Sequence, residues 1–167
     1  MPYLRAAVGA RMQDSLFTYV NAETTSNDHY TPKWVFDLLD VTFDLDVAAP
    51  VGGVPWIPAL QSYSQADDGL VQPWHGLVWC NPPFSDILPW VRRLNQHGNG
   101  IALLPHTKGA WREEIWQRAD GLVESKEINQ MLFNYQGRSN KAVFPTLFIA
   151  AWGTTGLEAI AKLGRVR

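Results

Sequence analysis

The feature that most constrains this chain is an apolar run, Gly76 to Cys80, that ends in Asn81-Pro82-Pro83-Phe84. Asn81 and Pro82 each precede a proline, which disfavours helical backbone, and both prolines have a fixed φ. The pattern therefore predicts a strand followed by a stiff, extended arm. Such an arm holds the Asn81 amide and the Pro82 carbonyl in set directions, so that they can accept two hydrogen bonds from one amino group. The Phe84 ring just beyond can stack on the group that carries it.

Composition indicates one globular domain. The 167 residues are 46% hydrophobic and only 18% charged, which suits a chain with a full buried core. The formal net charge of −2 argues against tight, non-specific binding to nucleic acid, although a local basic face remains compatible with it.

The cysteine and histidine content and the lengths of the apolar runs argue against disulfide-rich, metal-binding, secreted and membrane proteins. Cys80 is the single cysteine, so we expect neither a disulfide framework nor a thiolate metal site. The four histidines lack metal-ligand spacing, and no metal is expected. The apolar patch at residues 6–10 is shorter than a signal peptide requires, and no run reaches membrane-spanning length. We expect a soluble protein of a reducing cytoplasm without membrane partners.

Periodicity gives a coarse element order. Residues 1–29 are expected to form an arm or short helix and a linker, and residues 30–167 a single domain. Thr31 is expected to cap a short helix that has Pro32 at its first position and runs to Leu39. Further helices are predicted at 86–96, 107–119 and, weakly, 157–163. Strands are predicted at 43–49, 77–80, 101–105, 121–123, 128–133 and 143–152, with residues 54–63 read as a short strand or irregular chain.

This order predicts an α/β fold with a mainly parallel sheet, an antiparallel closing strand pair and helices on both faces. In such sheets ligands bind at the carboxyl ends of the strands. The segments Asp46 to Gly53, Asp67-Asp68 and Asn81 to Phe84 each follow an expected strand or turn at that edge. We therefore expect them to share one crevice.

Several segments in this order resemble the bacteriophage Dam-type DNA N6-adenine methyltransferases, within the superfamily of amino-methyltransferases that use S-adenosylmethionine. The resemblance covers roughly residues 30–152 and rests on Tyr30-Thr31-Pro32-Lys33-Trp34-Val35-Phe36, Phe43-Asp44-Leu45-Asp46-Val47-Ala48-Ala49, Asp67-Asp68-Gly69-Leu70, Val78-Trp79-Cys80-Asn81-Pro82-Pro83-Phe84, Leu103-Leu104-Pro105 and Phe144-Pro145-Thr146. It implies a Rossmann-like methyltransferase sheet. The sequence itself offers no separate target-recognition domain, and none is expected.

The resemblance also implies residue roles. Asn81-Pro82-Pro83-Phe84 would be the catalytic motif. The methionine end of the cofactor S-adenosylmethionine would lie near Thr31-Pro32 and the turn from Asp46 to Ala49, which includes Ala48. Asp46 suits the cofactor ammonium, and Asp67 or Asp68 suits the adenosine hydroxyls or amine; helix capping and turn formation are the plain alternatives for Thr31 and for the two aspartates. One departure is that the usual glycine-rich motif reads Val47-Ala48-Ala49-Pro50-Val51-Gly52-Gly53.

For the substrate, Ser85, Lys108 and Arg138 are candidate contacts, and the polar loop at residues 134–141 is a candidate for target recognition. A basic rim could also include Lys33, Arg92, Arg93, Arg112 and Lys141, although each is more often a solvated surface charge. His106, just past an expected strand, is a candidate for a substrate contact, although a plain polar loop residue is the preferred interpretation.

The resulting hypothesis is methylation of the N6 amino group of adenine in DNA, with the base flipped into the pocket, by an enzyme encoded by a phage or prophage and acting in the host cytoplasm. One alternative keeps the fold and methylates a protein glutamine amide or an RNA adenine. Another is a catalytically silent nucleic-acid-binding relative. The target sequence, the oligomeric state and any part in restriction-modification stay open.

Overall fold

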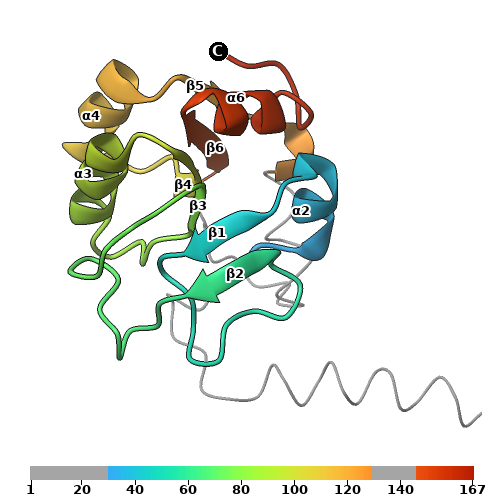
Figure 1. Cartoon of the computed structure of the whole chain (residues 1–167). Coiled ribbons are helices and arrows are strands. Elements are labelled where there is room, and N and C mark those ends of the chain that lie inside the picture. The colour runs from blue at the N-terminus through green and yellow to red at the C-terminus, as the bar shows by residue number, and fades with distance from the viewer. Residues whose placement is uncertain (1–29, 129–145) are drawn as a thin grey trace, which may run out of the picture.

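The computed structural model describes residues 30–128 and 146–167. Its centre is one six-stranded sheet (Figure 1), with the strand order β2-β1-β3-β4-β6-β5. The strands are β1 (Phe43–Asp46), β2 (Ala59–Ser62), β3 (Val78–Cys80), β4 (Gly100–Pro105), β5 (Gly121–Val123) and β6 (Leu147–Trp152). The pairs β1·β2, β1·β3 and β3·β4 are parallel, whereas β6 is antiparallel to both β4 and β5.

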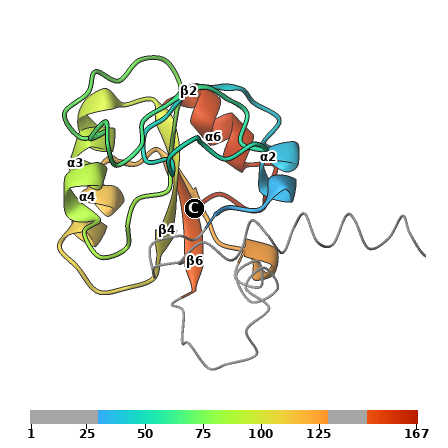
Figure 2. The ribbon, with the colours of Figure 1, turned by 90° about the horizontal axis from the view of Figure 1, so that it is seen from below.

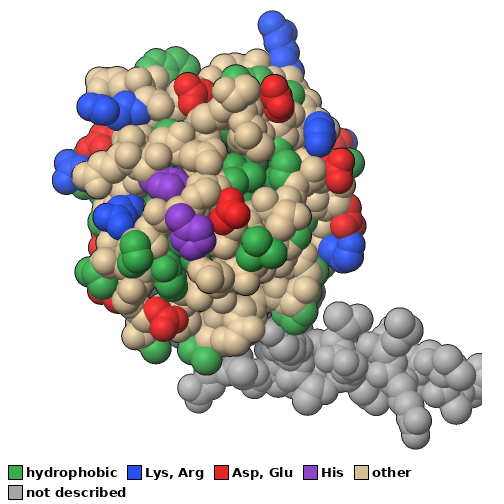
Figure 3. Space-filling view, in the orientation of Figure 1, with side chains coloured by type: hydrophobic (Ala, Val, Ile, Leu, Met, Phe, Trp, Pro, Cys, Tyr) green, Lys and Arg blue, Asp and Glu red, His purple; other side chains and the backbone are tan. Residues whose placement is uncertain are grey.

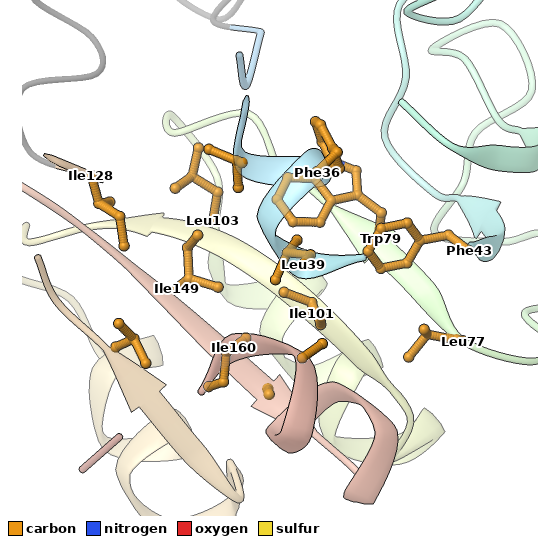
Figure 4. Close-up of a cluster of buried hydrophobic side chains, with 14 of the residues drawn as sticks. Phe36, Leu39, Phe43, Leu77, Trp79, Ile101, Leu103, Ile128, Ile149 and Ile160 are labelled. Carbon is orange, nitrogen blue, oxygen red and sulfur yellow. The ribbon is translucent and has the colours of Figure 1, made fainter. Parts of the chain in front are cut away.

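Helices cover both faces of the sheet (Figure 2). The helices α2 (Lys33–Leu39) and α6 (Thr154–Ile160) lie on one face, and α3 (Leu88–His97) and α4 (Trp111–Arg118) lie on the other. Each face has its own apolar cluster. On the α2 side, Phe36 and Leu39 pack with Trp79 and Ile160 (Figure 4). The mixed α/β architecture, the mostly parallel sheet and the helices on both faces are confirmed.

The closing strands differ in detail from the prediction. An antiparallel pair closes the sheet, but it joins β6 to the short strand β5, and β6 also pairs along its whole length with β4. Ile128, expected to begin a strand, lies instead in a helical segment, where its backbone N–H donates to the Ser125 hydroxyl oxygen at 3.1 Å. The rest of that expected strand, the polar loop and the arm at residues 1–29 lie outside the described residues.

The start of α2 corrects a second expectation. Pro32 has extended backbone (φ −65°, ψ 152°) and is the N-cap, so the helix begins at Lys33, and no side chain caps it. Thr31 is therefore not a helix cap. The indole N–H of Trp56 donates to the Thr31 carbonyl oxygen at 2.8 Å, which fixes the chain just before the helix.

The other helices are present where the periodicity indicated, with shifted ends. Residues 107–110, expected to open a helix, are not helical, and α4 begins only at Trp111. The final helix begins at Thr154, three residues before its predicted start. Among the described residues, no helix has the length and apolar character needed to cross a membrane.

Candidate functional site

A pocket of about 580 Å³ lies where β1, β2 and β3 end. Because these strands are parallel neighbours, the segments that follow them meet at one edge of the sheet. The segment before α2 and one residue of α3 complete the wall. The lining residues are Tyr30, Thr31, Asp46, Val47, Ala48, Ala49, Pro50, Val51, Val54, Ile57, Ser64, Gln65, Asp68, Gly69, Trp79, Asn81, Pro83 and Trp90.

The pocket brings together about half of the residues singled out from the sequence. Six of them line it, namely Thr31, Asp46, Ala48, Asp68, Asn81 and Pro83. The structure places six others outside the lining, namely Pro32, Asp67, Pro82, Phe84, Ser85 and Lys108. Arg138 lies outside the described residues.

Asp46 is the buried acid of the site. Its side chain is only 3% exposed, and one carboxylate oxygen accepts a hydrogen bond from the Ala48 backbone N–H at 3.3 Å. Burial raises the pKa of Asp46 from 3.8 to about 7, and the Ala48 hydrogen bond offsets only part of that shift. An acid in this state becomes ionised readily when a cation is placed beside it.

The turn that follows β2 presents Asp68 and Gly69 to the pocket. Asp68 has a φ of +56°, and its carboxylate accepts from the Leu70 backbone N–H at 3.3 Å. A Cβ at Gly69 would lie 2.0 Å from the Val47 carbonyl oxygen, so only glycine fits there. Asp67 stabilises the turn itself. Its exposed carboxylate accepts hydrogen bonds from both the backbone N–H and the hydroxyl of Ser64.

The arm after β3 runs from the buried core to the surface. Cys80 and Pro82 are buried, Asn81, Pro83 and Phe84 are half-buried, and Ser85 is exposed. Phe84 packs against both apolar clusters, which explains why its ring is not part of the pocket wall. Burial raises the pKa of the Cys80 thiol, and the charge of Asp46 raises it further, so this cysteine stays protonated as a plain core residue.

Sequence reasoning missed most of the apolar wall. Trp79 and Trp90 are buried core residues, and each also lines the pocket. Trp90 stacks on Trp74 with ring centroids 6.5 Å apart, and the Trp74 indole N–H donates to the Gly69 carbonyl oxygen at 2.7 Å. These contacts tie the turn at Asp68 and Gly69 to helix α3. Trp79 lies in β3 close to Asn81, whereas Trp90 lies inside α3, so no local pattern in the sequence marks the two as parts of one pocket wall.

Several cations of the expected basic rim are engaged within the fold. Lys33 pairs with Asp37, Arg92 pairs with Glu114 at 2.7 Å, and Arg93 donates to the Gln72 carbonyl oxygen at 2.8 Å. The side of the molecule in Figure 3 has Lys and Arg scattered among Asp and Glu, without one basic patch on the described residues in view.

Farther along the same edge, His106 follows β4 and Glu124 follows β5. Their side chains approach to 3.0 Å, and the His106 ring packs on Phe148 with centroids 4.8 Å apart. Within residues 30–128 and 146–167, three or more His, Cys, Asp or Glu side chains nowhere gather as a metal site would require.

Comparison with known proteins gives one match. A family model described as DNA N-6-adenine-methyltransferase (Dam) matches residues 20–124. This range contains β1 to β4, the pocket and the Asn-Pro-Pro-Phe arm. Searches of curated proteins and of solved structures gave no match.

Proposed function

Since that match spans more than half of its residues, the chain belongs to the DNA N-6-adenine-methyltransferase (Dam) family, and we propose that its pocket holds both the methyl donor and a flipped-out adenine. Membership supports methyltransferase activity on adenine N6 in DNA in general. The observation that carries the finer proposal is that Asp46, the last residue of β1, lines the same pocket as Asn81, which directly follows the neighbouring parallel strand β3.

The pocket residues fit S-adenosylmethionine. The pocket volume of about 580 Å³ is in the usual range for a small-molecule site. Asp46 would bind the ammonium group, since a buried acid with a pKa near 7 is stabilised in its ionised form by a cation. Asp68 at the turn would accept from the adenosine hydroxyls, and Val54, Ile57 and Trp90 supply apolar walls. Asp68 suits this role better than Asp67, because the Asp67 carboxylate already accepts two hydrogen bonds from Ser64.

The reaction needs a nucleophilic amino group. When bound, S-adenosylmethionine would supply a methyl group held on a positively charged sulfur. The adenine N6 nitrogen would bond to the methyl carbon as the carbon–sulfur bond breaks, and S-adenosylhomocysteine would be the leaving group. The N6 lone pair is delocalised into the ring, so the amino group is a poor nucleophile until it becomes pyramidal. By accepting its two N–H groups, the Asn81 amide oxygen and the Pro82 carbonyl oxygen would favour that geometry. They would also stabilise the positive charge that develops on N6 before a proton is lost to solvent.

The prolines contribute alignment. Pro82 is buried and Pro83 lines the pocket, and a fixed φ at both limits the motion of the Asn81 backbone. Alignment of reacting groups is worth roughly 7 to 11 kcal/mol in favourable cases. The rigid arm therefore supports a mechanism by positioning, without a covalent intermediate.

A base inside a duplex cannot reach this pocket, so the adenine must flip out at a cost of a few kcal/mol. We propose that Phe84 stacks on the flipped base. Because the Phe84 ring packs against both clusters, it would present an edge or one face only, and stacking would return about 1 to 3 kcal/mol at most.

DNA contacts outside the pocket stay proposals. Ser85 and Lys108 are exposed and follow β3 and β4, whose ends lie at the pocket edge of the sheet. Both could reach the phosphates that flank the target base, together with Arg138. We likewise infer that the sheet is the Rossmann-like sheet of S-adenosylmethionine enzymes, which its parallel strands and two helical layers support. An origin in a phage, action in the host cytoplasm and a part in restriction-modification also remain proposals.

The deciding experiment is transfer of a labelled methyl group. The protein is incubated with labelled S-adenosylmethionine and unmethylated genomic DNA, and the DNA is digested to nucleosides. Labelled N6-methyladenine is the expected product. Parallel reactions with total RNA and with a glutamine-containing peptide mixture test the two alternative amino substrates, and label in RNA or peptide but not in DNA would refute the proposal.

A further inference from the structure

Two buried polar atoms of the pocket wall have no hydrogen-bond partner. They are the Thr31 hydroxyl oxygen and the Trp79 indole nitrogen, and both are fully shielded from solvent. Thr31 is 1% exposed and Trp79 is 0% exposed, and both line the pocket. Buried polar groups in folded proteins are nearly always paired, since an unpaired one loses its hydrogen bonds to water without replacement. Two such atoms in residues that line one pocket therefore point to a ligand group that pairs with them.

The Trp79 side chain lies next to Asp46. The two residues are directly paired in the parallel ladder of β1 and β3. Their strand neighbours Leu45 and Val78 belong to the cluster on the α3 side, whereas Trp79 belongs to the cluster on the α2 side. Because side chains alternate along a strand, Asp46 and Trp79 share the α2 face, where Thr31 precedes the helix. An acid and two possible donors thus belong to residues that line one pocket.

The Trp79 ring is held firmly in place. Figure 4 shows it between Phe36 and Phe43, and its ring centroid lies 4.8 Å from the first and 5.6 Å from the second. Thr31 is held through its carbonyl oxygen by Trp56. The Trp79 nitrogen is thus fixed in direction by its ring neighbours, and the Thr31 backbone is fixed beside the pocket.

We propose that the indole N–H of Trp79 and the hydroxyl of Thr31 bind the carboxylate of an α-amino acid moiety, beside the ammonium group on Asp46. An indole N–H can only donate, and a threonine hydroxyl can donate, so their common partner is an acceptor. An α-amino acid carries its carboxylate and its ammonium on one carbon atom, which matches neighbouring donors and acid. This inference rests on the proposed function, because S-adenosylmethionine is the ligand that brings such a moiety.

The test compares two ligands that differ only in that carboxylate. Calorimetry measures binding of S-adenosylhomocysteine and of its decarboxylated analogue, so that no methyl transfer is needed. Trp79→Phe should weaken binding of S-adenosylhomocysteine by roughly 10- to 100-fold, the range for one hydrogen bond to a charged group. The same variant should leave the affinity for the decarboxylated analogue within about twofold. Thr31→Val, which keeps the shape of the side chain, should give the same ligand-dependent pattern.

The matched control is Trp116→Phe on α4. Trp116 is 77% exposed and is not part of the pocket wall, so this change should alter neither affinity. If Trp79→Phe lowers the affinity for both ligands by the same factor, the tryptophan acts only through packing and the inference is overturned.

Because Trp79 is a core residue, a measurement on the unchanged protein guards against a variant that fails to fold. The indole N–H resonances of the wild type are recorded by NMR with each ligand, after assignment of the Trp79 signal. That signal should move with S-adenosylhomocysteine and stay in place with the decarboxylated analogue; identical shifts with both would overturn the inference. Binding with this pattern but no methyl transfer to DNA would instead refute the proposed function alone.

Discussion

At the scale of single residues, the proposed chemistry depends on one oxygen atom of Asn81. This side chain lines the pocket at the end of β3, between a buried cysteine and two prolines. Its neighbours hold the backbone, so a substitution here changes the acceptor without changing the arm.

Asn81→Ala should therefore reduce the rate of methyl transfer to DNA by about 100-fold or more, as loss of one positioned transition-state contact does. The affinity for S-adenosylhomocysteine should stay within a few-fold of the wild type. Single-turnover kinetics and calorimetry measure the two quantities. Asn81→Asp serves as the control, since a carboxylate also accepts from N–H groups and should retain more activity than alanine. An alanine variant with wild-type turnover would exclude the mechanism.

Asp46 shows that a residue suited to binding can work against folding. Its pKa is about 7 in the fold and 3.8 in the unfolded chain, so the folded protein binds the proton more tightly. Stability from this group is therefore highest in acid, falls as the pH rises from about 4 to 7, and stays low above that. The full loss corresponds to about 4 kcal/mol, as an order of magnitude.

Asp46→Asn should remove this loss, because an amide carries no charge and its oxygen can still accept from the Ala48 N–H. The free energy of unfolding of the ligand-free variant, measured with urea, should exceed that of the wild type by several kcal/mol at pH 8. The difference should shrink as the pH approaches 4. The same variant should bind S-adenosylhomocysteine more weakly. A variant that is less stable than the wild type at pH 8 would contradict the account.

At the scale of elements, the pocket depends on how closely the turn after β2 approaches the turn after β1. Gly69 touches the Val47 carbonyl oxygen, and Trp74 holds the Gly69 carbonyl from the other side. The turn is thereby fixed between β1 and α3, with Asp68 at its tip.

Gly69→Ala should displace this turn, because the new Cβ would lie 2.0 Å from a backbone oxygen that cannot move freely. We expect a loss of about 1 to 3 kcal/mol in stability, typical of overpacking, together with weaker binding of S-adenosylhomocysteine. Thermal unfolding and calorimetry measure both. Ala66→Ser, an exposed change in the same turn, should leave both unchanged. A Gly69→Ala protein with unaltered affinity would show that the turn does not shape the pocket.

The positions of helices and strands could be predicted from the sequence where a local residue pattern determines them. The strand before Asn81 and the helix with Trp90 and Leu94 followed from an apolar run and from helical spacing. The start of α2 was mispredicted because Thr31-Pro32 has the composition of a helix N-terminus, whereas a distant tryptophan, Trp56, determines the backbone there. Contacts across 25 residues leave no mark in local periodicity.

At the scale of the whole molecule, the parallel sheet and the gathering of Asp46, Asp68 and Asn81 at one edge could be predicted, because parallel strands deliver their ends to the same side. The position of β6 between β4 and β5 could not, since strand order depends on long-range packing. The unpaired hydroxyl of Thr31 and the unpaired indole nitrogen of Trp79 could not be predicted either. A tryptophan in a strand has the pattern of a core residue whichever way its nitrogen points.

The near-neutral pKa of Asp46 has a consequence for how the whole protein responds to its medium. In the proposed complex Asp46 is ionised, whereas below pH 7 the free protein keeps a proton on it. Cys80 beside it stays protonated throughout, so it does not take up that proton. Binding of S-adenosylhomocysteine at pH 6 should then release up to about one proton and weaken by up to about tenfold per unit of pH below 7.

Calorimetry in buffers of different ionisation enthalpy measures this release at pH 6, and the release should vanish at pH 8 and in Asp46→Asn. Equal binding enthalpies in all buffers at pH 6 would exclude the coupling. In the proposed complex, hydrogen ion and methyl donor are competitors for one carboxylate, so an acidified medium acts on this methyltransferase as a competitive inhibitor does.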